Sequence, residues 1–170
     1  MKERNWKPMD CVREARELLQ EITPLKMDCG RVCGARCCRS LEGEETGMLL
    51  FPGEEDCYED KVGWRILPAG QELLLICPGT CSREERPLAC RMFPLVPLPA
   101  EDGAAVRMDE RARGICPLTR QGKKGMNPLF TEAVRQAGEL LLRDKNQRQF
   151  LERLAAEQED LKALRKRLKG

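Results

Sequence analysis

The chain contains ten cysteines and no histidine in 170 residues. Eight of the cysteines fall in two dense runs and one later position: Cys29, Cys33, Cys37, Cys38, Cys77, Cys81, Cys90 and Cys116. Cysteine is scarce in ordinary globular domains, so this content needs a chemical reason. Because there is no imidazole, a bound metal would be held by thiolates, alone or with carboxylates. This leaves all-thiolate zinc or an iron–sulfur cluster and excludes the mixed Cys/His zinc fingers.

The N-terminal sequence favours a reducing compartment. Charges are scattered through the first 17 residues, and no apolar signal core or small-residue cleavage site follows them. The longest apolar runs, Met48–Phe51 and Leu73–Cys77, are too short to span a membrane. We therefore expect a cytoplasmic protein without a membrane span, whose thiols stay reduced. A cysteine pattern in that setting favours metal binding or catalysis over structural disulfides, which are the alternative.

Composition along the chain predicts three regions. Residues 1–26 form an N-terminal helix that packs on the core, residues 27–118 a cysteine-rich metal-chelating domain, and residues 119–170 the C-terminal amphipathic helices. In the middle region, WRILP at 64–68 and ELLLIC at 72–77 predict short strands. The expected fold class is mainly α, with few short strands and a loop-rich, cysteine-rich middle held in shape by bonds to metal.

The two ends of the chain carry the clearest helix signals. Asp10 is a suitable N-cap for a helix whose apolar residues share one face: Val12, Ala15, Leu19 and Ile22. Asn127–Pro128 is a second start signal. Two apolar stripes at helical spacing follow it: Phe130, Ala133, Val134, Ala137 and Leu141, then Phe150, Leu151, Leu154, Leu161, Leu164 and Leu168.

Charge says little about partners. The net charge of +2, from 30 basic and 28 acidic residues, neither demands nor excludes an anionic ligand. The last nine residues, KALRKRLKG, carry five positive charges and no acid. We interpret them as a solvated helix end that complements the helix dipole, so nucleic acid is not expected. The C-terminal helices are the candidate surface for a protein partner.

The spacing of the cysteines suits metal ligation. Short gaps let the chain fold back so that two sulfurs approach one metal. Gaps of three residues separate Cys29 from Cys33, Cys33 from Cys37, and Cys77 from Cys81, and glycines at 30, 34 and 79 provide turn freedom within or beside them. The adjacent pair Cys37–Cys38 indicates a polynuclear centre, two neighbouring sites, or one ligand beside one spectator.

Arginines alternate with the cysteines in both runs, at positions 31, 36 and 39 and at 83, 86 and 91. Four thiolates around one divalent metal leave a net charge of about −2, which nearby guanidinium groups offset. We expect Arg86 and Arg91 to support the site in this way, as second-layer residues that bind the cofactor's thiolate shell.

The cysteine order and the segment RPLACRMFP at 86–94 resemble the YkgJ-type family, a zinc- or iron-chelating domain named for its CxxCxxCC motif. Arg86, Pro87, Cys90, Arg91 and the Phe93–Pro94 pair match every fixed position of the family's RPxxCRxFP signature. The resemblance covers about residues 27–118 and leaves Cys11 and Cys57 outside. It implies that the eight cysteines named above are the metal ligands.

One departure from the family concerns the opening run. The family's gaps there are two residues, whereas both gaps here are three, which loosens the match at Cys29 and Cys33. A similar cysteine signature occurs in flagellin lysine-N-methylases, which resemble iron–sulfur-dependent methyl-transfer enzymes. Those chains are considerably longer than this one.

Three functions remain open from the sequence. The first is a metal-chelating module without catalysis of its own, with an iron–sulfur cluster, of the 4Fe-4S type, favoured over zinc because eight thiolates exceed what one zinc needs. The second is a methyltransferase-like or redox enzyme that uses the cluster. The third is a redox-sensing interaction protein. Without histidine, no Ser-His-Asp or Cys-His pair is available, and no glycine-rich phosphate loop is present.

Overall fold

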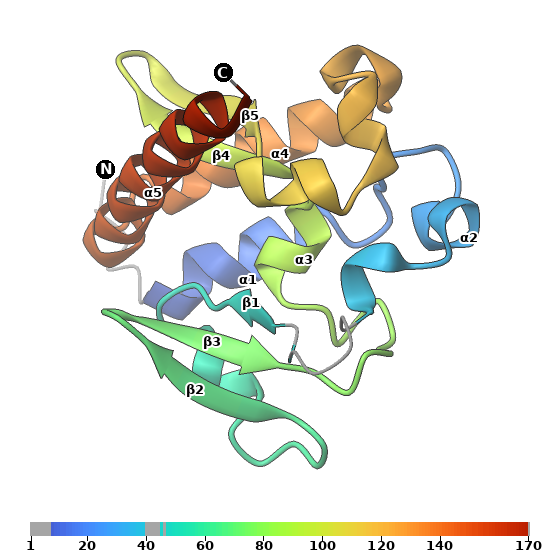
Figure 1. Ribbon diagram of the computed structural model, residues 1–170. Helices are drawn as coiled ribbons and strands as arrows, with labels where there is room; N and C mark the ends of the chain where they lie inside the picture. Colours follow the sequence, from blue (N-terminus) through green and yellow to red (C-terminus); the bar gives the residue numbers. More distant parts are fainter. Residues whose placement is uncertain (1–7, 40–44, 46, 170) are drawn as a thin grey trace.

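The structure is a computed structural model that describes residues 8–39, 45 and 47–169. The predicted N-terminal region therefore lies in part, at residues 1–7, outside the described residues. The elements in chain order are α1 (Pro8–Leu18), α2 (Cys29–Cys33), η1 (Arg36–Cys38), β1 (Gly47–Leu49), η2 (Glu54–Cys57), β2 (Arg65–Ala69), β3 (Glu72–Ile76), α3 (Leu88–Met92), β4 (Leu95–Ala100), β5 (Gly103–Met108), η3 (Glu110–Gly114), η4 (Pro117–Arg120), η5 (Lys123–Gly125), α4 (Pro128–Leu141) and α5 (Lys145–Lys169), with η denoting 3-10 helices. Figure 1 shows their arrangement.

The prediction of a mainly α fold with a loop-rich middle is wrong. The middle of the chain forms two antiparallel sheets, one of three strands in the order β1-β3-β2 and one of two strands, β4-β5. The expected strands are β2 and β3, which pair from Arg65↔Ile76 to Ala69↔Glu72 around a two-residue turn. Gly70 stands in that turn with φ +65°, a conformation that glycine adopts without strain.

The β4–β5 hairpin is the largest feature that the sequence analysis missed. Its first strand, LVPLPA, contains Pro97 and Pro99, which argue against a strand in a larger sheet. Here they are tolerated because both strands of a two-stranded sheet are edge strands. Each strand has a hydrogen-bonded neighbour on one side only, so the missing N–H groups of proline affect a single ladder of hydrogen bonds. Pro97 lies opposite Val106, and the turn closes at Ala100↔Gly103.

The main core lies where the terminal helices meet this hairpin. Helix α1 packs on α4, and α4 and α5 both pack on the hairpin. The helices α1, α4 and α5, with the residue after α1, contribute fully buried residues: Val12, Ala15, Leu19, Phe130, Val134, Ala137, Leu141 and Leu151. The hairpin contributes Leu95, Val96 and Val106, which are also buried. The apolar face predicted for the second-last helix is buried throughout. Of the face predicted for the first helix, Val12, Ala15 and Leu19 are buried, whereas Ile22 lies beyond the end of α1 and is half-buried.

Helix α4 approaches the hairpin unusually closely at Gly138. A Cβ atom there would lie 2.5 Å from the Cβ of Pro97 and 2.7 Å from the Cβ of Ala104. Both distances are shorter than any ordinary contact, so only glycine fits this position while the helix stays in place.

Helix α5 follows this arrangement only in its first half. Phe150, Leu151 and Leu154 are buried, whereas Leu164 and Leu168 near its end are 53% and 79% exposed. Within the described residues, no helix is long and apolar enough to cross a membrane.

Helix α3 links the two halves of the molecule. It contacts α1, β1 and β4, and it lies centrally in Figure 1. Below it, a small second core forms on the three-stranded sheet from Leu50, Tyr58 and Leu75, with Trp64 packed against them. Because α3 carries Cys90, the fold places this cysteine at the junction of both cores.

Candidate thiol cavity

All eight cysteines singled out by the sequence line one cavity of about 300 Å³. They come from separate elements: Cys29 and Cys33 from α2, Cys37 and Cys38 from η1, Cys77 and Cys81 from the segment after β3, Cys90 from α3, and Cys116 from the residue before η4. The two remaining cysteines lie elsewhere. Cys11 is buried in the main core and Cys57 is exposed. The structure thus gathers the same eight residues that the sequence pattern separated from the other two.

The first three-residue gap, between Cys29 and Cys33, falls within α2. This helix is a single turn, in which residues four apart lie on the same face, so Cys29 and Cys33 are directed alike. Asp28 caps the turn by accepting a hydrogen bond from the Gly30 N–H at 3.1 Å.

A left-handed turn then directs the chain into η1. Gly34 has φ +65° and Ala35 has φ +53°. Alanine seldom adopts this region, so Ala35 holds a strained conformation that the surrounding structure maintains. The reversal brings Cys37 and Cys38 back to the cavity that α2 borders.

The adjacent thiols of Cys37 and Cys38 interact directly. Their Sγ atoms are 4.0 Å apart. This hydrogen bond lowers the pKa of Cys38 to about 6, with the positive charge of Arg86 acting in the same direction against burial. The same bond, together with burial, raises the pKa of Cys37. Cys38 is therefore the thiol most readily converted to the thiolate that a metal binds.

Electrostatic interactions divide the thiols into two groups. Cys90 interacts with Cys38, Cys77 and Cys81, and burial is the main reason that its pKa is raised. Cys29 interacts instead with Cys33 and Cys116. We call these the inner group (Cys38, Cys77, Cys81 and Cys90) and the outer group (Cys29, Cys33 and Cys116). Cys37 interacts with members of both.

Arg86 is the cation of the inner group. Its guanidinium hydrogen-bonds the Cys81 side chain and interacts with the charge of Cys38, and these contacts raise the Arg86 pKa although burial acts against them. Its Nε is buried without a hydrogen-bond partner among the described residues. A buried N–H of this kind is suited to a sulfur or other acceptor inside the cavity.

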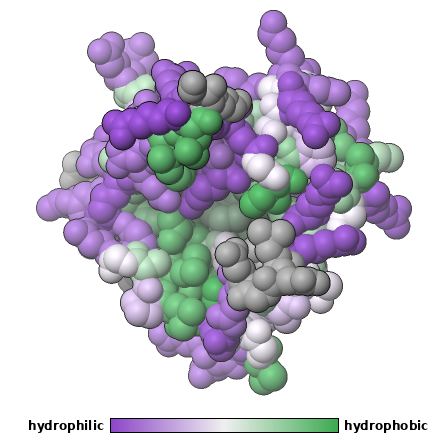
Figure 2. Space-filling model, in the orientation of Figure 1, coloured by the Kyte–Doolittle hydropathy of each residue, from purple (hydrophilic) through white to green (hydrophobic). Residues whose placement is uncertain are grey.

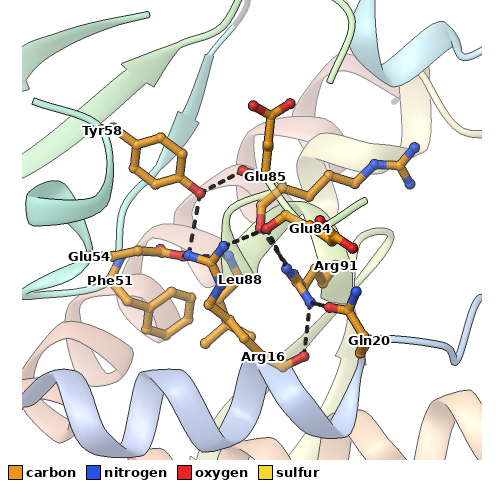
Figure 3. Close-up of polar contacts among 10 residues, drawn as sticks. Arg16, Gln20, Phe51, Glu54, Tyr58, Glu84, Glu85, Leu88 and Arg91 are labelled. Carbon is orange, nitrogen blue, oxygen red and sulfur yellow. Dashed lines mark hydrogen bonds and ion pairs between the residues drawn. The ribbon is translucent and has the colours of Figure 1, made fainter. Parts of the chain in front are cut away.

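Arg91 lies in the cavity wall but its donors are directed elsewhere. It is 4% exposed and donates to the carbonyls of Arg86, Arg16 and Glu84, at 3.0, 3.0 and 2.9 Å, and to the Gln20 side chain. Burial lowers its pKa to about 10. Figure 3 shows this guanidinium between α1 and the segment that precedes α3. Arg91 thus fixes the backbone around the thiols, and Arg86 faces the thiols themselves.

Glu54 is the buried acid that completes this support, and the sequence analysis did not identify it. Its carboxylate is 0% exposed and accepts hydrogen bonds from the Leu88 N–H at 2.7 Å, the Phe51 N–H at 3.3 Å and Arg16 at 3.2 Å. Figure 3 draws Glu54 together with Phe51, Leu88 and Arg16. Burial raises its pKa, while the three donors favour the charged form. In sequence it is one of several neighbouring acids, and no local signal distinguishes it.

The eight thiols line only part of the cavity. Its remaining wall is largely apolar and includes Leu25, Met48, Trp64, Phe93 and Leu118. Figure 2 shows the molecule hollowed near the middle of this face, with apolar residues gathered beside the hollow. Among residues 8–39, 45 and 47–169, no three His, Cys, Asp or Glu side chains are grouped closely enough to hold a single metal ion. The thiols therefore surround a space and do not converge on one point.

No family model, curated protein or solved structure matches this chain. The geometry of the cavity and the chemistry of its lining therefore carry the functional argument.

Proposed function

We propose that this chain is a thiolate metal-binding protein that holds an iron–sulfur centre in the cavity. The observation that carries the proposal is that eight cysteines from five segments of the chain line one space. Free thiols scattered over 88 residues of sequence have no packing reason to meet at one cavity. Thiolate ligation is the chemistry that requires them to do so.

The size of the cavity favours a polynuclear centre over one zinc ion. A cavity of about 300 Å³ has room for roughly 20–30 waters, since one water needs roughly 10–15 Å³ by the same measure. A single tetrahedral ion would leave most of that space empty. An iron–sulfur cluster distributes its thiolates over several metal atoms, which suits thiols placed around a wide space.

The polar groups of the cavity fit such a centre. A cluster bound by thiolates is negatively charged, and Arg86 provides positive charge beside Cys38 and Cys81. The free Nε–H of Arg86 would find acceptors in the sulfur atoms of the cluster. The resemblance to the YkgJ-type family, carried by RPLACRMFP, points to the same class of ligand.

We further propose that the protein acts in a reducing compartment, where these thiols stay available to metal. A chelating role without its own catalysis is the simplest one, because the chain has no histidine to pair with a nucleophile. The methyltransferase-like alternative would need the apolar part of the cavity, around Met48 and Trp64, to bind a second molecule.

Anaerobic purification followed by metal and sulfide analysis tests the proposal. We expect a brown protein with broad absorbance near ~400 nm and with iron and acid-labile sulfide in similar amounts. The Cys57→Ser variant is the matched control and should keep all of these, because Cys57 lies outside the cavity. A colourless protein with stoichiometric zinc would mean that the cavity binds zinc and not an iron–sulfur centre. A protein without metal would refute the proposal.

A further inference from the structure

The positive charge of the chain is concentrated in two segments that border the cavity. Residues 24–39 and 111–127 together contain nine basic side chains and one acidic side chain, Asp28. The rest of the chain contains 21 basic and 27 acidic residues. A net charge of +2 therefore hides a strongly positive part and a negative remainder.

These two segments are neighbours in the folded chain. Both contribute to the cavity wall, through Leu25 and Cys29 on one side and Cys116 and Leu118 on the other. The Asn127 N–H donates to the Pro24 carbonyl at 2.8 Å and joins their ends. In Figure 1, α2 and the 3-10 helices after β5 occupy the same side of the molecule.

Most of this positive charge is exposed and unpaired within the described part of the chain. Arg111 and Arg113 form ion pairs with Asp109 and Glu110, and Lys123 donates to the Val106 carbonyl. The other six cations have no ion pair among the described residues and all are exposed: Lys26, Arg31, Arg36, Arg39, Arg120 and Lys124. Such a concentration attracts anionic surfaces over distances up to about 10 Å at moderate salt.

Exposed apolar side chains lie within the same two segments. Met27 is 59% exposed, Val32 is 60% exposed and Ile115 is 40% exposed. Val32 also lines the cavity, so this apolar area reaches its mouth. Exposed apolar side chains in the same segments as unpaired cations are typical of a protein interface, which combines apolar contacts with polar and charged ones.

We propose that this surface, which we call the basic rim, docks an acidic protein over the mouth of the thiol cavity. The basic rim consists of the six exposed cations together with Met27, Val32 and Ile115. Charge complementarity specifies an acidic partner, and the apolar centre favours a protein over nucleic acid, whose phosphates gain nothing from Met27 and Val32. A partner docked there would sit beside the outer group of thiols.

Site-specific photo-crosslinking tests this inference on the full chain in the cells from which it comes. A photoreactive phenylalanine replaces Met27, which is exposed and does not line the cavity. A second sample carries the same group at Leu168, which is 79% exposed on α5. We expect a discrete cross-linked acidic protein from position 27 only, identified by mass spectrometry and then shown to bind when purified.

Two charge-reversal variants separate docking from general electrostatics. Lys26→Glu with Arg31→Glu alters the basic rim without touching the cavity lining, and Lys166→Glu with Arg167→Glu makes the same net change on α5. We expect the first pair to lower cross-linking about tenfold and the second to leave it unchanged. Equal effects of both pairs, cross-links to nucleic acid, or no discrete product from position 27 would overturn the inference. Metal content, measured on the same samples, reports separately on the proposed metal centre.

Discussion

The Leu88 N–H donates a 2.7 Å hydrogen bond to the carboxylate of Glu54, and this bond joins the 3-10 helix η2 to the start of α3. Leu88 is the first residue of α3 and Cys90 lies two residues further on. A fully buried acid thus satisfies a free N–H at the helix start and sets the position of a cavity thiol.

Glu54→Gln should disturb both roles. The amide keeps the size of the side chain but replaces one acceptor oxygen by an NH₂ donor. That donor would face backbone N–H groups that need an acceptor. The change also removes the buried carboxylate that pairs with Arg16. We expect the free energy of unfolding to fall by about 3 kcal/mol in urea titrations. Asp56→Asn, in the same 3-10 helix but exposed, is the control and should change it little. Equal stability of both variants would mean that Glu54 does not support α3.

Substitutions of the two arginines in the RPLACRMFP segment should affect different properties, stability for one and metal retention for the other. Arg91→Gln removes donors from three partly buried carbonyls, so we expect a loss of about 2–4 kcal/mol in unfolding free energy. Arg86→Gln should cost less stability but weaken metal retention about tenfold, because Arg86 faces Cys38 and Cys81. Chelator competition and urea unfolding measure the two effects. If Arg86→Gln mainly lowered stability and Arg91→Gln mainly weakened metal retention, the roles assigned to the two arginines would be wrong.

The inner and outer thiol groups give a third prediction. Cys90→Ser should remove nearly all bound iron and sulfide, because Cys90 interacts with every other member of the inner group. Cys116→Ser should retain a centre with altered absorption, since Cys116 interacts only with the outer group among the thiols that affect its pKa. Metal analysis of both variants beside Cys57→Ser provides the comparison. An equal loss from Cys90→Ser and Cys116→Ser would show that all eight thiols serve one indivisible centre.

Cys11 should make the protein sensitive to alkaline pH. Burial raises the pKa of its thiol from 9.0 to about 11. Above pH 9 the unfolded thiol ionises while the folded thiol stays protonated, so the folded state binds more protons and stability falls as pH rises towards 11. The loss is on the order of 2–3 kcal/mol over this window and absent below it. Cys11→Ala should abolish that part of the decline, as measured by urea unfolding at pH 8 and pH 10.5. A parallel decline in both proteins would contradict it.

The features that the sequence predicted are those that depend on residues close together in the chain. The apolar face of α1 and that of α4 follow from helical spacing, and Val12 and Phe130 are fully buried as expected. Turn-forming gaps predict that the cysteines within each run lie close together, whereas the meeting of both runs and Cys116 at one cavity depends on contacts between distant segments. The role of these cysteines as metal ligands remains a prediction. Hairpin β2–β3 was signalled by two apolar runs around Gly70.

What the sequence could not predict depends on contacts between distant segments. Prolines in LVPLPA lower the strand signal, and only the pairing with β5 shows that an edge position tolerates them. Glu54 acquires its role from Leu88, which is 34 residues away. The basic rim likewise becomes apparent only when residues 24–39 and 111–127 are placed side by side.

None of the eight cavity cysteines belongs to either hydrophobic core among the described residues; Cys11 is the one cysteine that does. The forces that shape the chain therefore act apart from the groups proposed to bind metal. We expect the polypeptide to fold first and to bind its metal centre afterwards. Binding and release of the metal centre then require no unfolding of the hydrophobic cores.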